Sequence, residues 1–191
     1  MHLASASPRR AEILDALGVC YSVAGVDMDE QRLPGEAADA MALRLARDKA
    51  AVARGTQPLP VLAADTIVVV DDAVFGKPQD RDDALAMLAY LSGRSHKVMT
   101  GVAMVWDGGQ RTALSVTEVH FREIGPDEAI AYWQSGEPCG KAGAYAIQGL
   151  GGVFVERIHG SYSAVVGLPV YETAKLLAAA GIDVINRAVK Q

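Results

Sequence analysis

The sequence predicts an α/β fold in which helices flank a mixed, twisted sheet. Segments typical of strands and helices alternate along the 191 residues, the pattern of strands joined by helical crossovers. Residues 61–70 form a near-continuous apolar run, as in a strand buried on both faces. Gly108-Gly109 between two further strand-like segments indicates a hairpin, which adds antiparallel pairing. We find no linker or repeat, so residues 1–191 are expected to form one domain.

The amino-terminal part is predicted to contain two short strands and two helices. Ser7-Pro8 signals a helix start, because serine suits the N-cap and proline the first helical position. Gly18 signals the end of this helix. The alanine-rich segment 36–54 favours a second, long helix. The expected elements are a strand ending at residue 4, a helix over 8–17, a strand over 19–23 and a helix over 36–54.

The rest of the chain is predicted to alternate in the same way. Turn residues occupy Asp71-Asp72 and Gly76-Lys77-Pro78, and Pro169 and Gly181 bracket a final helix. The expected elements are a hairpin turn at 71–72, a loop at 76–78, helices over 80–91, 126–133 and 169–180, and strands over 61–70, 97–106, 112–121 and 153–158.

Composition excludes several classes of protein. The formal net charge of −5 argues against a general nucleic-acid binder, which needs a basic surface. No charge-free apolar run reaches the roughly 18 residues of a membrane span, and no signal peptide is visible, so a cytoplasmic protein is expected. Cys20 and Cys139 are predicted to be buried free thiols, and the four scattered histidines are interpreted as structural or surface residues.

A candidate anion site lies where the first strand meets the first helix. The hydroxyls of Ser5 and Ser7 add donors to a helix N-terminus, where backbone N–H groups already favour an anion. Arg9 and Arg10 add forked positive charges that suit phosphate. Because positive charge in the first turn opposes the helix dipole, this pattern favours an anionic ligand over an ordinary capped helix.

Asp65 is the strongest single-residue signal in the sequence. It lies inside the apolar run 61–70, where a carboxylate is costly unless it is paired or bound to a cation. We therefore interpret Asp65 as functional rather than as an aspartate satisfied by backbone N–H groups. Thr66 is expected to point to the opposite face of the strand.

Other charged residues are weaker candidates. Asp27, Asp29 and Glu30 form an acidic segment whose carboxylates can hold Mg²⁺ or Mn²⁺, although such a segment alone is more often a solvated turn. Lys49 lies late in the predicted long helix and Lys77 in the 76–78 loop, and each alone would be interpreted as a surface charge.

Small residues dominate the segment 141–149, which permits a close approach of the backbone to a ligand. Gln148 in this segment carries an amide that both donates and accepts hydrogen bonds, so it can read the edge of a nucleotide base. A buried amide bonded to backbone is the alternative interpretation.

Together these segments resemble the Maf family of nucleoside triphosphate pyrophosphatases over nearly the whole chain. Asp65-Thr66 and Ile147-Gln148-Gly149 look like the branch that hydrolyses dTTP and UTP rather than the branch that acts on 7-methyl-GTP. The resemblance is carried, in order, by residues 3–10 (LASASPRR), Asp29-Glu30, Lys49-Ala50, Ala64-Asp65-Thr66, Gly76-Lys77-Pro78, Ser92-Gly93, residues 141–149 (KAGAYAIQG), Gly160-Ser161-Tyr162 and residues 166–169 (VGLP).

The resemblance implies a Maf/ITPase-like fold of two lobes around a central cleft, a divalent cation (Mg²⁺ or Mn²⁺) and often a homodimer. It implies that Asp65 accepts a proton. It also implies specificity positions at Arg9, Thr66 and Gln148, and active-site charges at Glu30, Lys49 and Lys77. Gly140 and Ala146 depart from the family pattern and bear on the geometry of the 141–149 segment.

Our hypothesis is metal-assisted hydrolysis between the α- and β-phosphates of a nucleoside triphosphate, giving a monophosphate and pyrophosphate. Glu30 and Asp65 would hold the metal, and Asp65 would also take the proton of the attacking water. The basic residues Arg9, Arg10, Lys49 and Lys77 would neutralise the phosphates, with Ser5 and Ser7 adding donors.

Two alternatives remain open at this stage. The first is a pyrophosphatase of another base preference, such as one for 7-methyl-GTP or modified purine nucleotides. The second is a nucleotide-binding regulator of cell division or septum formation that has no essential catalysis.

Overall fold

The computed structural model of the chain describes residues 1–71 and 73–185, and these form two compact units. Unit 1 comprises Met1–Asp65, Thr100–Ser115 and the described residues from Gly167 onward. Unit 2 comprises Thr66–Met99 and Val116–Val166. The architecture is mixed α/β, as the alternation of segments predicted. That residues 1–191 form a single domain stays a prediction.

Within the described residues, seven strands form one mixed sheet in the order β2-β1-β3-β5-β6-β7, with β4 paired to β3. β1 runs parallel to β2 and β3, whereas β4 is antiparallel to β3 and β7 is antiparallel to β6. The strands are β1 (His2–Ala4), β2 (Ser22–Ala24), β3 (Val61–Val70), β4 (Ala73–Phe75), β5 (Ser95–Trp106), β6 (Gly109–Phe121) and β7 (Val155–His159).

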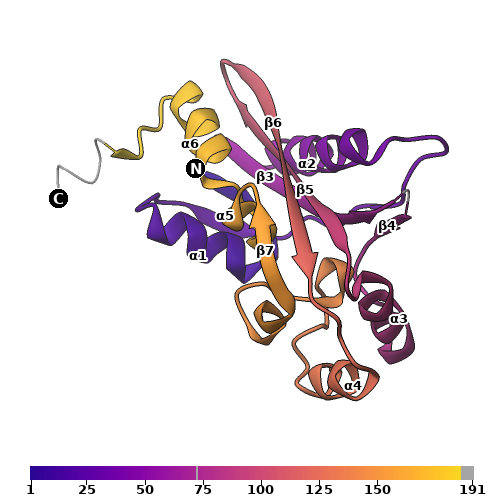
Figure 1. Cartoon of the computed structure of the whole chain (residues 1–191). Coiled ribbons are helices and arrows are strands. Elements are labelled where there is room, and N and C mark those ends of the chain that lie inside the picture. Colours follow the sequence, from indigo (N-terminus) through magenta and orange to yellow (C-terminus); the bar gives the residue numbers. More distant parts are fainter. Residues whose placement is uncertain (72, 186–191) are drawn as a thin grey trace. The chain divides into compact units, whose positions relative to one another are not determined.

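Unit 1 has helices on both faces of its strands: α1 (Pro8–Ala16) and α6 (Val170–Ala179) on one, α2 (Ala38–Arg54) on the other. Figure 1 shows α2 lying alongside β3. Small residues form the core under α2: Ala4, Ala46, Ala50, Ala53, Val61, Ala63 and Ala103. Leucines dominate the opposite core, among them Leu3, Leu14, Leu62, Leu168, Leu176 and Leu177. Because strand residues alternate between faces, the odd-numbered residues of β3 face α2.

A glycine lets α2 approach the sheet closely. A Cβ atom at Gly101 of β5 would lie 2.3 Å from the carbonyl oxygen of Ala42 in α2. Any larger residue at this position would therefore push the helix away from the strands. The short distance between helix and sheet follows from glycine here and from the alanines of the adjoining core.

Unit 2 is built around an aromatic core. Its helices are α3 (Arg81–Leu91), α4 (Pro126–Gln134) and α5 (Tyr162–Val166), with 3₁₀ turns η1 (Ala142–Ala144) and η2 (Leu150–Phe154). The rings of Phe121, Tyr132, Tyr145 and Phe154 meet in edge-to-face or tilted pairs. Asp80 caps α3 by accepting a hydrogen bond from the N–H of Asp83 at 2.9 Å. This core carries the segment 141–149 through Ala144 and Tyr145.

Several boundaries differ from those predicted. β2 begins at Ser22 rather than at residue 19, because Val19 closes α1 instead, its N–H bonding to Leu14 O at 3.1 Å. The 3₁₀ turn η2 delays β7 to Val155. β4, α5 and both 3₁₀ turns were not expected. Of the turn predicted at 71–72, Asp71 is left-handed with φ 49° and residue 72 lies outside the described residues.

The prediction that Cys20 and Cys139 are buried is wrong, because both thiols are free and exposed. Cys20 lies in the link between α1 and β2, and Cys139 lies in the turn after α4, and neither position offers a core to pack against. Among the residues that the structure describes, no helix combines the length and the apolar character needed to cross a membrane.

Candidate active site

Three charged residues from distant segments meet in unit 1. The ammonium Nζ of Lys49 lies 2.5 Å from Asp65 Oδ1 and 2.5 Å from Glu30 Oε1. The side chains of Lys49 and Asp65 are each 10% exposed, whereas that of Glu30 is 41% exposed. This cluster, which we call the charged centre, brings together Glu30, Lys49 and Asp65 as the sequence analysis proposed.

The local structure explains why Lys49 and Asp65 meet. Asp65 follows Val61 and Ala63 on the face of β3 that α2 covers. Lys49 lies three residues after Ala46 and four before Ala53, so all three share the buried face of α2. Lys49 is therefore buried, unlike the surface charge that a lone lysine usually represents. The same helical spacing, read from the sequence, could have placed it on the buried face.

The charged centre compensates burial with pairing. A buried ion is strongly unfavourable unless an opposite charge and hydrogen bonds replace its water. Here one ammonium serves two carboxylates, which leaves the cluster with an excess of negative charge. One oxygen of each carboxylate, Asp65 Oδ1 and Glu30 Oε1, contacts the same cation, the Lys49 ammonium.

Arg10 adds positive charge beside this cluster. Burial lowers the pKa of its guanidinium, while the charges of Asp65 and Glu30 oppose that shift and the charge of Arg9 adds to it. Nε of Arg10 donates to Gly167 O at 2.8 Å, and Nη1 donates to Ser5 Oγ at 3.2 Å. These two bonds hold the guanidinium in one orientation at the start of α1.

The serines at the start of α1 play different parts. Ser7 occupies the N-cap position, and Pro8 opens the helix as predicted. Ser5 is buried, and its Oγ accepts from the backbone N–H of Ser7 at 3.1 Å as well as from Arg10. Arg9 is half-buried, and burial lowers its pKa against the opposing charge of Glu12. The strand-to-helix junction thus carries two guanidinium groups, of which that of Arg10 is held by hydrogen bonds to Gly167 O and Ser5 Oγ.

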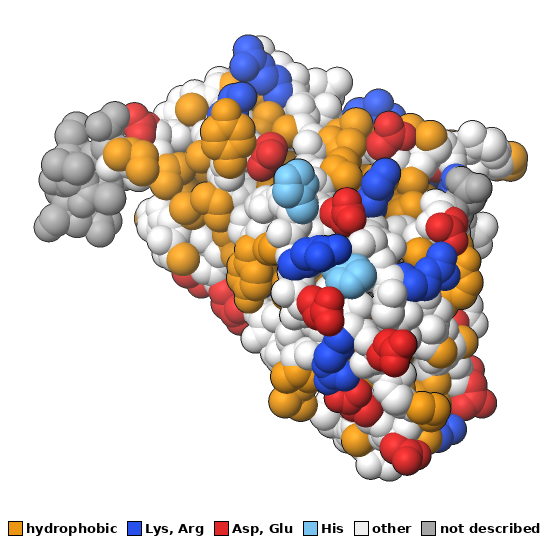
Figure 2. Space-filling view, viewed as in Figure 1, with side chains coloured by type: hydrophobic (Ala, Val, Ile, Leu, Met, Phe, Trp, Pro, Cys, Tyr) orange, Lys and Arg blue, Asp and Glu red, His pale blue; other side chains and the backbone are white. Residues whose placement is uncertain are grey.

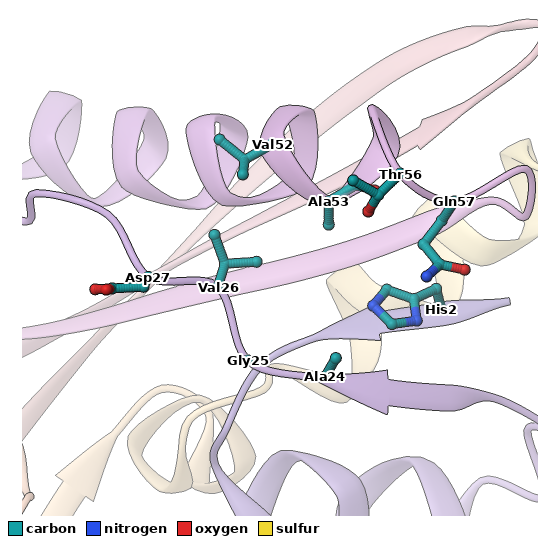
Figure 3. Close-up of a pocket in the computed structure, with 9 residues that line it drawn as sticks. All are labelled: His2, Ala24, Gly25, Val26, Asp27, Val52, Ala53, Thr56 and Gln57. Atoms are coloured by element: carbon teal, nitrogen blue, oxygen red, sulfur yellow. The ribbon is translucent and has the colours of Figure 1, made fainter.

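The acidic segment divides its carboxylates. Glu30 joins the charged centre, whereas Asp29 Oδ1 accepts from the N–H of Gln31 at 2.9 Å and so shapes a turn. Asp27 lines a pocket of about 210 Å³ together with His2 and Gln57. Figure 3 shows this pocket between the end of α2 and the segment after β2. The charged centre is not part of its lining.

The remaining predicted site residues, Thr66, Lys77 and Gln148, belong to unit 2. Thr66 is half-buried and directly follows Asp65 on β3, so it points to the opposite strand face. Lys77 and Gln148 are exposed. The loops that carry them are joined, because Gly143 N donates to Gly76 O at 3.0 Å. That Lys77 and Gln148 converge with Asp65 on one ligand stays a prediction.

Sequence reasoning missed two residues that hold the segment around Gln148. Glu137 accepts hydrogen bonds from the N–H groups of Leu150 and Gly151, each at 2.9 Å, and from the hydroxyl of Tyr132 at 2.7 Å. Tyr132 Oη in turn accepts from the N–H of Ala146 at 3.1 Å. No local sequence pattern indicates that Glu137 holds this loop, because its partners are backbone N–H groups 13 and 14 residues further along the chain.

The donor set for a metal ion is small. Within residues 1–71 and 73–185, no three or more His, Cys, Asp and Glu side chains are grouped so that they could hold a metal. The pair Glu30 and Asp65 is the one that the sequence proposed, and both carboxylates face the same cation, the ammonium of Lys49.

The molecular surface carries mixed charge. On the face shown in Figure 2, Lys and Arg side chains of the described residues are interspersed with Asp and Glu side chains. Interspersed charge is unlike the basic stripe that tracks a nucleic-acid backbone. That the protein is not a general nucleic-acid binder, inferred from the net charge of −5, stays a prediction.

Comparison with known proteins adds an independent finding. The family model described as Maf-like protein matches residues 1–180. A dTTP/UTP pyrophosphatase of Saccharophagus degradans is 52% identical over 189 residues, which cover 96% of this chain and 90% of that protein. One of Syntrophomonas wolfei is 50% identical over 187 residues, covering 96% and 99% of the two chains. One of Bordetella parapertussis is 52% identical over 194 residues, covering 96% and 94%.

Among solved structures, a nucleoside-triphosphatase (dITP/XTP pyrophosphatase) from Mycobacterium abscessus matches with a TM-score of 0.39 and 16% identity. The match covers 63% of this chain and 71% of that one.

Proposed function

Because this chain belongs to the Maf family, we propose that it is a dTTP/UTP pyrophosphatase. It hydrolyses dTTP and UTP to the nucleoside monophosphate and pyrophosphate. The relatives that carry this activity in their names share about half of their residues with it over nearly the full length. The observation that carries the proposal is the charged centre, where Glu30, Lys49 and Asp65 meet within 2.5 Å contacts.

The reaction needs both positive and negative groups in the site. A triphosphate brings several negative charges, and its hydrolysis needs a base for the attacking water. In the proposed reaction, water attacks the α-phosphorus and Asp65 takes its proton. The bond from the α-phosphorus to the bridging oxygen breaks, and pyrophosphate leaves with that oxygen. Lys49 holds Asp65 in place through Oδ1 and contributes positive charge beside the phosphates.

A divalent cation fits this site. Mg²⁺ is commonly held by one or two carboxylates together with substrate phosphates and water. Glu30 and Asp65 each pair with Lys49 through one carboxylate oxygen, Oε1 and Oδ1, and each carries a second oxygen on the same group. A bound Mg²⁺ or Mn²⁺ would supply charge neutralisation and polarisation of the phosphate oxygens. Glu30 and Asp65 would hold it.

Basic residues bind the polyphosphate in this proposal. Arg9 and Arg10 offer guanidinium groups at the start of α1, where the helix N-terminus also favours an anion. Ser5 and Ser7 adjoin the same helix start. Lys77 neutralises the leaving pyrophosphate.

Base choice is assigned to Thr66 and Gln148 in unit 2. The amide of Gln148 both donates and accepts, which matches the edge of a pyrimidine. A site that hydrogen-bonds its substrate rejects a mismatched base, because its polar groups are then left unpaired. The enzyme is proposed to act in the cytoplasm and to form a homodimer.

A screen of pyrophosphate release tests the proposal. The purified protein is assayed with dTTP, UTP, the other common nucleoside triphosphates and 7-methyl-GTP, with Mg²⁺, with Mn²⁺ and with EDTA. We expect release from dTTP and UTP in the presence of either metal and none with EDTA. Preference for 7-methyl-GTP would support the alternative base specificity. Binding of nucleotides without release under any condition would support a regulator.

A further inference from the structure

We infer that Glu137 is a positioning residue for base selectivity, which acts by fixing the backbone on both sides of Gln148. The inference rests on the proposed function, because it concerns how that enzyme distinguishes its substrates. Glu137 is half-buried in the turn after α4, and it lies in unit 2 with Gln148. Its carboxylate is hydrogen-bonded to the Tyr132 hydroxyl and to the backbone N–H groups of Leu150 and Gly151, so it would act through the loop.

The loop is anchored at two points that flank Gln148. On one side, Ala146 N donates to Tyr132 Oη at 3.1 Å, and Tyr132 donates to Glu137 Oε1 at 2.7 Å. On the other side, Leu150 N donates to Glu137 Oε2 and Gly151 N to Oε1, both at 2.9 Å. Gln148 is two residues from Ala146 and two from Leu150, so one carboxylate governs both ends of this short loop, residues 146–151.

The carboxylate also fits closely against the backbone of the loop. A Cβ atom at Gly149 would lie 2.0 Å from Glu137 Oε2 and 2.5 Å from its carboxyl carbon. Glycine is therefore required at 149 for the carboxylate to reach its two N–H donors. Gly149 and Glu137 thus form a matched pair, with the small residue next to Gln148.

The hydrogen bonds are of the strong, charge-assisted kind. Burial raises the pKa of the Glu137 carboxyl, but hydrogen bonds from Gly151, Tyr132 and Leu150 and the charge of Lys141 outweigh it and leave that pKa below its usual value. Glu137 is thus ionised at neutral pH, and an ionised acceptor binds N–H groups about twice as strongly as a neutral one.

Gln148 lies in a turn that is closed by two backbone hydrogen bonds, from Gly149 N to Ala146 O at 3.2 Å and from Gly152 N to Gly149 O at 3.0 Å, and the Glu137 anchors fix where that turn lies. It is exposed and lies between η1 and η2, outside any helix or strand. Displacement of a substrate-contacting group by about 1 Å can cost about 10²-fold in activity. Loss of the anchors should therefore weaken recognition of the base while it leaves the charged centre in unit 1 intact.

The test is a double-mutant cycle on Glu137 and Gln148. In Glu137→Gln, one oxygen becomes an amide that cannot accept from an N–H group. We expect KM for dTTP and UTP to rise about tenfold. We expect kcat to change less than about threefold, and the preference over purine triphosphates to shrink. Glu128→Gln, which removes an ion pair to Arg122 in the same unit, is the matched control and should leave KM unchanged.

The double variant separates positioning from general structure. If Glu137 acts through Gln148, then Glu137→Gln adds little to KM in a Gln148→Ala background, so the two effects are not additive. Additive effects on KM would overturn the inference, as would a loss confined to kcat. If Glu137→Gln does not fold, Tyr132→Phe replaces it in the KM measurement, because this variant keeps the ring and removes only the hydroxyl. It should raise KM in the same direction.

The wild-type protein in the same assay separates a failure of the Glu137 role from a failure of the proposed function. Wild-type activity on dTTP and UTP together with unchanged KM and selectivity in the folded variants overturns only the role of Glu137. A wild-type protein that releases no pyrophosphate from any nucleotide overturns the proposed function, and this inference falls with it.

Discussion

The charged centre of unit 1 and the loop around Gln148 in unit 2 are assembled by different forces. In the first, full charges from an acidic segment, a helix and a strand meet at the Lys49 ammonium, largely out of water. In the second, one carboxylate and one tyrosine hydroxyl hold backbone N–H groups of a loop. Both bring together residues distant in sequence, but only the first concentrates charge.

This difference matches two different tasks. Charge concentrated in a buried site is suited to a polyanion and to proton transfer, where each group changes rates by orders of magnitude. A loop held by hydrogen bonds is suited to the recognition of shape and polarity, where one lost bond changes affinity by about tenfold. The expected consequences of substitutions therefore differ in size and in kind between the two regions.

The largest effect is expected at Asp65. Asp65→Asn keeps the shape of the side chain but removes its ability to take a proton and to pair fully with Lys49. Pyrophosphate release should fall by at least about 10²–10³-fold. The control is Asp48→Asn, one residue from Lys49 on the exposed side of α2. Near-normal turnover of a folded Asp65→Asn protein would remove Asp65 from the mechanism.

Lys49→Met tests the charged centre as a structural unit. Without the ammonium, the carboxylates of Glu30 and Asp65 lose the cation that they share, and the free energy of unfolding should fall by about 3 kcal/mol. Mg²⁺ should then raise the Tm of the variant more than that of the wild type, because the carboxylates gain a cation. Chemical and thermal unfolding, with and without Mg²⁺, measure both effects.

Lys97→Met, at an exposed position, is the matched control for Lys49→Met. An equal response of wild type and Lys49→Met to Mg²⁺ would argue against a cation site between these carboxylates.

In unit 2, burial keeps His96 in its neutral form, which makes the stability of the fold depend on pH. His96 is buried against Phe121, and its Nε2 lies 2.8 Å from the hydroxyl of Tyr145. Burial, followed by the charge of His120, lowers the pKa of His96 from 6.5 to about 4. Between these values the unfolded chain binds more protons than the folded one. His96 therefore stabilises the fold above pH 6.5, and about 3 kcal/mol of that stability is lost as the pH falls to 4.

Urea unfolding of the wild type and of His96→Gln between pH 7 and pH 4.5 measures this loss. The variant should be less stable at pH 7, and its free energy of unfolding should depend less steeply on pH. Subtracting one curve from the other cancels the contribution of the carboxylates, which both proteins share. His159→Gln controls for the loss of an exposed imidazole. Parallel curves for wild type and His96→Gln would contradict the assignment.

The smallest effect is expected from the contact between α2 and the sheet. In Gly101→Ala, the new methyl would meet Ala42 O at 2.3 Å, so α2 must shift, at a cost of about 2 kcal/mol. Because Lys49 is carried by α2, kcat should also fall. In Gly55→Ala, the nearest atom is Val52 O at 3.4 Å, so this control should change stability by less than about 0.5 kcal/mol. Equal Tm values for the two variants would show that the helix tolerates the shift.

Much of the fold could be predicted because its signals are local. Pro8 and Gly18 mark the limits of α1, the apolar run at 61–70 coincides with β3, and the glycines at 108–109 mark the β5–β6 hairpin. The elements that were missed, β4 and η2 among them, are short. Their few internal hydrogen bonds depend on neighbours, β3 for β4 and the Glu137 carboxylate for η2.

The candidate site could be predicted in part. Asp65 was identifiable because a carboxylate in an apolar strand needs a partner, and that partner is Lys49. The burial of Lys49 follows from its helical spacing relative to Ala46 and Ala53, a signal that was present and not used. Glu137 carries no such signal, because its partners are backbone N–H groups of a segment whose path depends on the aromatic core.

The sequence by itself determined the mixed α/β architecture, the main helices and strands, and which residue types could bind phosphate and a cation. Periodicity, caps and turn residues act over three or four neighbours, so they can be recognised without knowledge of the fold. Only the tertiary structure decided that one ammonium joins Glu30 to Asp65, 35 positions apart, and that Glu137 holds both ends of the Gln148 loop. Those contacts depend on how closely helix, strand and loop pack, which glycine at 101 and 149 allows and no local pattern specifies.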